Sequence, residues 1–279
     1  MIDLHLHSVC SDGTDTPAAL VAKAVDGGLT AVALTDHDTV AGVPPFLAAA
    51  ARAGLTGVSG VEVSATSAYG EMHLLGYFMD PVHAELTAML SSIRSSRAVR
   101  NAAIRERLAE LGVPLSEQEI LDQAGEGVVG RPHFARAMVT RGYVPDTGTA
   151  FQRFLANHAP AYVPRKIMPA SEIIAVIGRA GGLVALAHPS TCEEDGQPLD
   201  RLVRELKEQG LAGLEVYHSR HGPRHIQQYG ELADALDLVP TGGSDYHGAA
   251  TPDLQPGRGF GSLRVPLDTV DRLRARVGV

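Results

Sequence analysis

Two histidines and a carboxylate lie close together within the first thirteen residues. His5 and His7 alternate with Leu4 and Leu6, and successive side chains of a strand point to opposite faces, so both imidazoles project from the same face. The turn that follows leaves Asp12 beside the end of this strand. Two imidazoles with a nearby carboxylate are typical ligands of a first-row metal ion, and the simpler alternative is a pair of surface histidines.

A second predicted strand, residues 31–34, also runs directly into polar side chains, among them His37. Parallel α/β folds keep their chemistry at the carboxyl ends of their strands, so His37 is a candidate ligand. Asp38 or Thr39 is expected to cap the next helix, which is predicted over residues 40–53. Capping and metal binding are compatible here because they use different side chains.

The next two predicted strands each carry one ionisable side chain. Glu62 stands between two valines in a strand over residues 57–64, and a buried carboxylate needs a partner, either a metal ion or an arginine. His73 lies near the start of a strand over residues 72–78, where it is either a ligand or a hydrogen-bonded core histidine. The neighbouring candidates favour a metal at Glu62 and leave both alternatives open at His73.

Two strands in the second half of the chain also lead into metal-binding residue types. His188 comes at the end of a buried strand over residues 182–189. Asp245 and His247 follow the last strand, within residues 238–247, and repeat the two-residue offset seen at the N-terminus. The same pattern therefore extends along the whole chain.

Three further residues are candidates for contacts with substrate phosphate. His218 and His221 follow a strand over residues 213–218, and they are either phosphate contacts or acids, or else surface histidines. Arg131 lies beside the start of a predicted helix, and a guanidinium group at a helix N-terminus suits an anion. We therefore expect Arg131 to bind a phosphate group.

The middle of the chain, residues 82–164, has helical patterns and no strand pattern. Four helices are predicted there: residues 84–111, a helix opened by a capping box at Ser116, residues 133–141 and residues 148–157. This stretch is predicted to be a small α-helical domain that caps the substrate site. It is inserted into an α/β domain formed by residues 1–81 and 165–279. Arginines are dense in it, with Arg165 and Lys166 at its exit.

Outside this stretch, strands and helices alternate about seven times, which is typical of a parallel sheet and, at this length, of a closed or nearly closed barrel. Nine side chains with metal-binding chemistry lie along these strands: His5, His7, Asp12, His37, Glu62, His73, His188, Asp245 and His247. They are too many for one ion and fit two or three adjacent divalent ions, most readily Mn, with Fe or Zn as alternatives. Adjacent ions acidify water and stabilise attacking and leaving oxygens, which suits the hydrolysis of phosphate esters.

The composition argues against several other classes of protein. A net charge of −8 without a basic tract disfavours binding to duplex DNA. Two cysteines indicate no disulfide framework. No signal peptide is visible and no apolar run is long enough to span a membrane, so we expect a cytoplasmic protein with no obligate protein partner.

The motifs around the nine residues resemble those of the PHP (polymerase and histidinol phosphatase) family. They are His5-Leu6-His7, Ser11-Asp12-Gly13, Thr35-Asp36-His37-Asp38, Gly60-Val61-Glu62, Met72-His73-Leu74-Leu75-Gly76-Tyr77, Ala187-His188-Pro189 and Gly243-Ser244-Asp245-Tyr246-His247. The resemblance covers all of the α/β part and implies a distorted (β/α)7 barrel with a trinuclear metal centre.

The resemblance also implies how the ligands are shared. The first ion would be held by His5, His7, Glu62 and Asp245, the second by Asp12, His37 and His247, and the third by Glu62, His73 and His188. Glu62 would bridge the first and third ions. Glu62, Asp245 and His188 are the candidate catalytic residues, and whether His188 or a bound water assists the leaving group stays open.

The helical insertion with Gly130-Arg131-Pro132-His133 is similar to that of a stand-alone subgroup acting on nucleotide phosphates. This implies removal of the 3′-phosphate from nucleoside 3′,5′-bisphosphates, or digestion of short 5′-phosphorylated RNA from its 5′ end, with Arg131 holding a second phosphate. The alternatives are a histidinol phosphate phosphatase, an amidohydrolase-type C–N hydrolase, and a non-enzymatic metal-binding or polymerase-accessory module. The arginines of the insertion, the lack of a strand lysine and the complete ligand set argue against each in turn.

Overall fold

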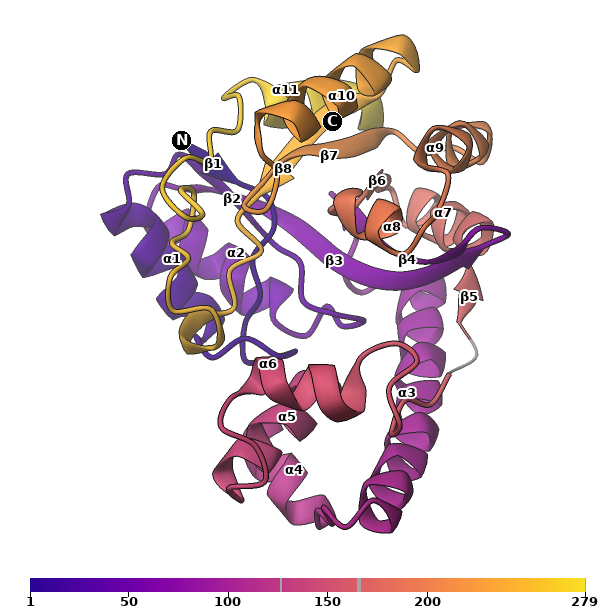
Figure 1. Cartoon of the computed structure of the whole chain (residues 1–279). Coiled ribbons are helices and arrows are strands. Elements are labelled where there is room, and N and C mark those ends of the chain that lie inside the picture. Colours follow the sequence, from indigo (N-terminus) through magenta and orange to yellow (C-terminus); the bar gives the residue numbers. More distant parts are fainter. Residues whose placement is uncertain (126, 165–166, 279) are drawn as a thin grey trace.

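The chain forms a nearly closed α/β barrel with a group of helices on one side of it (Figure 1). The computed structural model describes residues 1–125, 127–164 and 167–278, so Arg165 and Lys166, at the predicted exit of the insertion, lie outside it. The barrel strands, in spatial order, are β1 (Ile2–Asp3), β2 (Ala31–Leu34), β3 (Thr56–Ser67), β4 (Gly70–Tyr77), β6 (Leu183–Leu186), β7 (Gly213–His218) and β8 (Val239–Gly243). The short strand β5 (Met168–Pro169) pairs with the end of β3.

Strand β4 runs antiparallel to both of its neighbours, so the prediction of a wholly parallel sheet is wrong at this strand. A tight turn between Ser67 and Gly70 joins β3 to β4, with no helix between them. A strand that enters the sheet in reverse begins at the edge where its parallel neighbours end. His73, near the start of β4, therefore lies at the same edge as the residues that follow the other strands.

The barrel closes between its first and last strands. Leu4 N donates to Gly242 O at 3.1 Å, and Asp245 N donates to His5 O at 2.9 Å. Gly243 allows this approach, because a Cβ atom at that position would lie 2.4 Å from the backbone nitrogen of His5. The two chain segments that follow β1 and β8 are thus held side by side.

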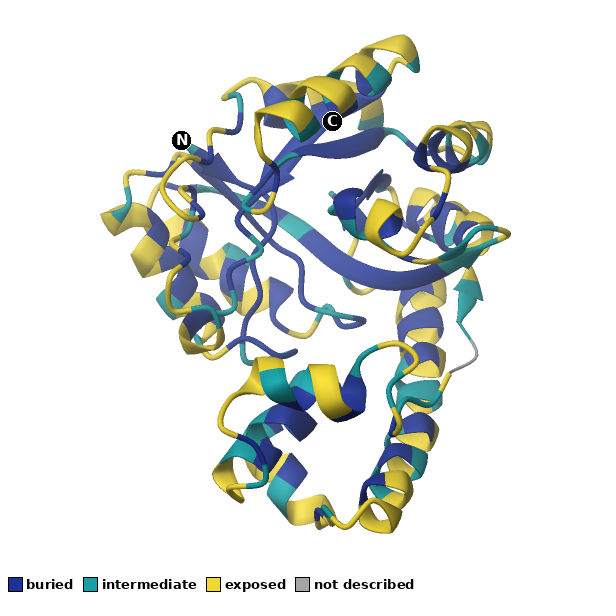
Figure 2. Ribbon diagram, in the orientation of Figure 1, coloured by how far each residue is buried: buried dark blue, intermediate teal, exposed yellow. Residues whose placement is uncertain are grey.

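Helices cover the outside of the barrel. They are α1 (Pro17–Asp26), α2 (Val43–Arg52), α7 (Ala170–Arg179), α8 (Ser190–Glu194), α9 (Leu199–Glu208), α10 (Pro223–Ala235) and α11 (Thr269–Val277), with a 3-10 turn, η2 (Gly248–Ala250). On α9 the buried residues Leu199, Leu202, Val203 and Leu206 form one apolar stripe. Figure 2 shows the result: buried strands inside, and exposed residues on the outer helix faces.

The remaining helices lie between β4 and β5 in the sequence and below the barrel in Figure 1. They are α3 (Ala84–Glu110), α4 (Glu117–Ala124), α5 (Arg131–Thr140), α6 (Thr147–Ala150) and a π-helical turn, η1 (Phe151–Leu155). They have an apolar cluster of their own, which includes Phe134, Met138 and Leu155. Ser116 and Glu119 form the predicted capping box. None of the helices described here is both long and apolar enough to cross a membrane.

The predicted cap of the second helix is wrong. Helix α2 begins at Val43 after Gly42, and no side chain caps it. The Asp38 carboxylate is used elsewhere: it accepts hydrogen bonds from Arg97 Nε on α3 at 2.6 Å and from Ser64 N at 3.1 Å. Asp38 therefore connects the barrel to the long helix of the insertion.

Candidate metal centre

Glu62 lies at the centre of a cluster of imidazoles at one end of the barrel. Its Oε2 atom faces three of them: His5 Nε2 at 3.1 Å, His7 Nε2 at 3.1 Å and His37 Nδ1 at 3.2 Å. Its Oε1 atom faces two more: His73 Nδ1 at 2.7 Å and His188 Nε2 at 3.0 Å. The side chain is buried, so the carboxylate is surrounded by nitrogen atoms in place of water.

Two other carboxylates complete the cluster. Asp245 Oδ1 lies 3.3 Å from His7 Nε2 and 3.5 Å from His5 Nε2. Asp12 Oδ1 lies 3.3 Å from His247 Nε2. All nine predicted ligands are therefore brought together, although they are spread from the first strand to the last.

The ligand atoms form three overlapping groups in which every atom lies within 4.8 Å of the others. The groups are His5, His7, Glu62 and Asp245; His7, Asp12, His37 and His247; and His37, Glu62 and His73. They differ from the sharing implied by the family resemblance in two places. His7 takes part in the second group as well as the first, and His37 takes the place of His188 in the third.

Several buried polar atoms of this cluster form no hydrogen bond with any described residue, although an oppositely charged or polar group lies within 4.0 Å of each. They are both ring nitrogens of His7, Asp12 Oδ1, His37 Nδ1 and His73 Nδ1. A buried polar atom without a partner costs about 1–3 kcal/mol. Cations satisfy such atoms, and imidazole with carboxylate suits divalent transition metals. The residues present thus fit a centre for two or three divalent ions.

The electrostatics of the cluster also fit cations. Burial opposes charge on Glu62 and Asp12, but the imidazoles around them lower the pKa of both carboxyl groups well below their usual range. Burial lowers the pKa of His37 to about 3. Ionised carboxylates and a neutral His37 are the states in which these groups bind metal ions. Burial opposes charge on His7, but the carboxylates of Asp245 and Glu62 raise its pKa to about 10, so a metal ion bound at His7 would displace a proton.

Three residues of the site adopt backbone conformations that side chains other than glycine rarely adopt. The φ angles are +53° at Asp38, +22° at His188 and +56° at Asp245. Such residues concentrate at functional sites because the surrounding structure has to hold them in place. At Asp245 the backbone turns immediately after β8.

Sequence reasoning assigned no role to Glu215, which supports the cluster from behind. It is completely buried; its Oε1 lies 3.0 Å from His5 Nδ1, and its Oε2 accepts a hydrogen bond from His188 N at 2.6 Å. Glu215 stands between Leu214 and Val216, so the signal that selected Glu62 was present here too.

Asp36 was also overlooked. It is buried and accepts hydrogen bonds from Ser8 N at 2.7 Å and from Ser11 Oγ at 2.6 Å. These bonds shape the loop between His7 and Asp12.

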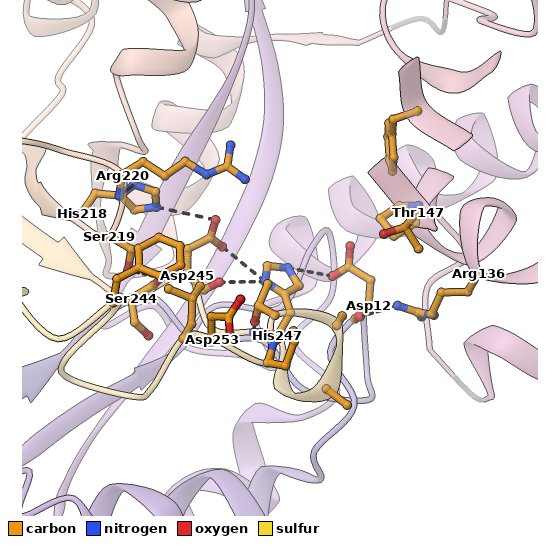
Figure 3. A pocket seen from close by; sticks show the side chains of 18 residues that line it. Asp12, Arg136, Thr147, His218, Ser219, Arg220, Ser244, Asp245, His247 and Asp253 are labelled. Atoms are coloured by element: carbon orange, nitrogen blue, oxygen red, sulfur yellow. Dashed lines mark hydrogen bonds and ion pairs between the residues drawn. The ribbon is translucent and has the colours of Figure 1, made fainter. Parts of the chain in front are cut away.

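The two histidines at the end of β7 and shortly after it have different environments. His218 Nδ1 accepts a hydrogen bond from Arg220 N at 3.3 Å, and its Nε2 points toward Asp245 Oδ2 at 3.6 Å (Figure 3). Both ring nitrogens of His221 are used inside the fold, by Val216 O at 2.9 Å and Ser190 Oγ at 3.1 Å. His218 therefore faces the ligand cluster, and His221 holds the chain behind it.

Two pockets adjoin the cluster. The first, here called the large pocket, has a volume of about 740 Å³ and its lining includes Asp12, His218, Asp245 and His247 (Figure 3). The second, here called the arginine pocket, has a volume of about 170 Å³ and its lining includes His37, His73, Arg97, Arg100 and Arg131. Asp12, Pro132 and Phe151 line both pockets, so the pockets meet between the cluster and the helical insertion.

Overlapping groups of imidazoles and carboxylates at the strand ends of a barrel define a metal-dependent hydrolase centre. Residues 3–129 match the PHP domain, and relatives about one-third identical extend over most of the chain, so the protein belongs to the PHP family. It is a metal-dependent phosphoesterase, as the sequence predicted.

Its relatives include two bacterial enzymes of similar length. A 5′-3′ exoribonuclease from Haemophilus influenzae is 33% identical over 88% of this chain and 89% of its own. A 3′,5′-nucleoside bisphosphate phosphatase from Chromobacterium violaceum is also 33% identical, over 88% of this chain and 87% of its own.

Two solved structures share the fold over nearly the whole chain. A proposed metal-dependent phosphoesterase from Bifidobacterium adolescentis has a TM-score of 0.91 at 32% identity, covering 99% of this chain and 96% of its own. An amidohydrolase from Chromobacterium violaceum, with bound sulfate and no metal, has a TM-score of 0.86 at 30% identity, covering 97% and 96%.

Proposed function

We propose that the protein hydrolyses nucleotide phosphates, removing the 3′-phosphate of nucleoside 3′,5′-bisphosphates and cutting the first linkage of short 5′-phosphorylated RNA. The observation that carries this proposal is the arginine pocket. It places three guanidinium groups beside His37 and His73 of the ligand cluster. A substrate with two phosphates has one for the cluster and one for these arginines.

Arg131 is the arginine best placed to bind the second phosphate. Its Nη1 donates to Leu155 O at 3.1 Å and to Asn157 Oδ1 at 3.0 Å, and its guanidinium lies 5.7 Å from the centre of the Tyr162 ring. These partners are all neutral, whereas Arg97 is paired with Asp38. Burial removes water from the guanidinium group of Arg131 and lowers its pKa, and a bound phosphate would compensate for the lost solvation.

The other partners of the reaction follow from the cluster. The nine predicted ligands would hold two or three divalent ions, which when bound supply polarisation of the phosphate and activation of water. The chain itself orients these ligands through Glu215 and Asp36, and the helical insertion covers the site. Hydrolysis breaks the P–O3′ bond, places the water oxygen on phosphorus and leaves a proton on O3′.

Two alternatives fit the structure less well. Histidinol phosphate has a single phosphate and leaves the arginine pocket without a role. A C–N hydrolase of the amidohydrolase type uses a carboxylated lysine on a strand, and no strand in the described part of the chain contains a lysine.

Product analysis with Mn-loaded protein tests the proposal. Adenosine 3′,5′-bisphosphate should give AMP and inorganic phosphate. Arg131→Ala should raise the KM for this substrate about 30-fold, equivalent to roughly 2 kcal/mol of charge-assisted hydrogen bonding, and should change the KM for adenosine 3′-monophosphate much less. Arg153→Ala, at an exposed arginine of η1, is the matched control.

Equal effects of Arg131→Ala on the two substrates would remove this residue from phosphate recognition. Hydrolysis of histidinol phosphate, with no turnover of either nucleotide or of a short 5′-phosphorylated RNA, would replace the proposed function altogether.

A further inference from the structure

The large pocket begins at the metal centre and opens to solvent. Asp12, Asp245 and His247 form its inner wall, and Figure 3 shows contacts linking His218, Asp245, His247 and Asp12 along it. Exposed residues, among them Arg220, form its outer wall. A volume of about 740 Å³ is within the range of small-molecule sites and large for a phosphate alone. The reaction at a terminal 3′-phosphate leaves this space unused.

An exposed aromatic ring lines this pocket. The Phe260 side chain is 62% exposed, although a phenylalanine ring is normally buried. Leu254 and Phe151 add further apolar surface to the lining. An apolar wall next to a highly polar metal centre indicates a ligand that is charged at one end and flat or apolar at the other.

The loop that carries Phe260 is held in a defined conformation. Gly257 N donates to the buried carboxylate of Asp3 at 2.6 Å, and Gln255 pairs with Gly259 in an antiparallel bridge. Gly259 has a φ of +53°, and a Cβ atom there would lie 2.5 Å from Ser219 Oγ. Phe260 is therefore presented by a braced loop whose backbone requires glycine.

The same loop is tied to the metal centre. Ser219, which packs against Gly259, donates a hydrogen bond through its Oγ to Ser244 O at 2.6 Å, one residue before Asp245. Asp3, which holds Gly257, also accepts a hydrogen bond from Ser244 N at 2.9 Å. The position of Phe260 is thus fixed relative to Asp245 and the other residues of the candidate metal centre.

We propose that Phe260 stacks on the base of the second nucleotide, whose O5′ atom is esterified to the reacting phosphate. The large pocket would then hold the RNA that continues downstream of the cut. This rests on the proposed function. The first nucleotide would have its 5′-phosphate in the arginine pocket and its 3′-phosphate at the metal centre. The second nucleoside would then enter the large pocket, where Arg220 can meet the next phosphate.

The same bond is hydrolysed in a 5′-phosphorylated dinucleotide and in a nucleoside 3′,5′-bisphosphate. In 5′-phosphorylated diadenylate, water attacks the linking phosphorus, the P–O3′ bond breaks, and O3′ of the first nucleotide takes a proton. The two products are both AMP. In adenosine 3′,5′-bisphosphate the same bond breaks, and the products are AMP and inorganic phosphate. Only the first substrate places a base in the large pocket.

The test compares these two substrates in Phe260→Ala. Stacking of one base on an aromatic ring contributes about 1–3 kcal/mol, so kcat/KM for the dinucleotide should fall about 5- to 150-fold. The kcat/KM for adenosine 3′,5′-bisphosphate should stay within twofold of the native value. Phe260→Tyr should restore the dinucleotide rate. Leu267→Ala is the matched control, since Leu267 is 63% exposed and does not line the pocket.

A third substrate isolates the base. A 5′-phosphorylated dinucleotide whose second residue is abasic should be cut equally well by the native protein and by Phe260→Ala. An equal loss with and without the base, or no loss with the dinucleotide, would overturn the stacking role while native turnover of the bisphosphate upholds the proposed function. Failure of the native protein on both nucleotide substrates would overturn both.

Discussion

Glu215 supports two residues of the candidate metal centre at once. One of its oxygens accepts a hydrogen bond from His5 Nδ1, which leaves His5 Nε2 directed at Glu62, and the other accepts a hydrogen bond from the backbone N–H of His188. A carboxylate can accept both bonds, because both of its oxygens are acceptors. Partners of this kind orient metal-binding imidazoles and raise their basicity.

Glu215→Gln should weaken metal binding about 10–100-fold, because glutamine offers one acceptor where two are needed. The measurement is metal affinity by titration of metal-free protein, with circular dichroism as a check on the fold. Glu231→Gln, at an exposed glutamate of α10, should bind metal like the native chain. An unchanged affinity in Glu215→Gln would show that packing alone holds His5.

The clustering of the nine candidate ligands was largely predictable at this scale, because each of them is a polar residue in or shortly after an otherwise apolar strand. Glu62, for example, is costly to bury unless something binds it. The missed residues show the limit of this approach. Glu215, like Glu62, stands between two apolar residues of a strand, but no recognisable motif surrounds it. The environment of His221 depends on the direction of a turn, which the spacing of residues does not indicate.

At the scale of the element, the direction of β4 decides where His73 lies. Alternating strands and helices indicate parallel pairs, and only the short polar connection between Ser67 and Gly70 distinguishes a hairpin from a helical crossover. The alternation of strands and helices predicted the barrel, but it did not predict the antiparallel direction of β4. Hydrophobic periodicity contains no information about strand direction.

Gly243→Ala should destabilise the protein by about 3 kcal/mol, because the new methyl group would overlap backbone atoms of His5 where β8 meets the first strand. The free energy of unfolding of metal-free protein in denaturant measures this. Gly178→Ala is the control: it lies in α7 with nothing within 4 Å of the added Cβ, so it should be neutral or stabilising by up to about 1 kcal/mol. Equal effects would show that closure does not depend on glycine.

At the scale of the whole molecule, an ion pair beside the candidate metal centre connects the barrel to the helical insertion. Asp38 follows the candidate ligand His37, and its carboxylate lies 2.6 Å from Arg97 Nη2 on α3. Arg94, one turn earlier on α3, donates to Asp38 O at 2.9 Å. The insertion is therefore fastened next to the candidate metal centre, and its helices carry the three arginines of the arginine pocket.

Asp38→Asn should lower the free energy of unfolding by roughly 3 kcal/mol, because it leaves the guanidinium of Arg97 without its buried counter-charge. Asp200→Asn removes an exposed ion pair with Arg204 on α9 and should leave the unfolding midpoint unchanged. Denaturant unfolding of both variants makes the comparison. Similar midpoints for the two would mean that the pair does not anchor the insertion.

The arrangement of the two parts was the least accessible to sequence reasoning. The helical character of residues 82–164 is visible in their pattern, but the contacts of Asp38 with Arg97 join positions far apart in the chain. Nothing in the sequence around Asp38 identifies it as the partner of Arg97. Aspartate is a common N-cap residue, so the sequence instead indicated that Asp38 caps the next helix. The two pockets belong to both parts and could not be located before these contacts were known.

The strained backbone at Asp38, His188 and Asp245 has a consequence for heat resistance. Holding a residue other than glycine in the left-handed region costs about 1 kcal/mol, and each of these three residues adds such a cost to the folded state. Substitutions that relax the backbone at these three positions should raise heat resistance, and they would disturb the candidate metal centre in doing so.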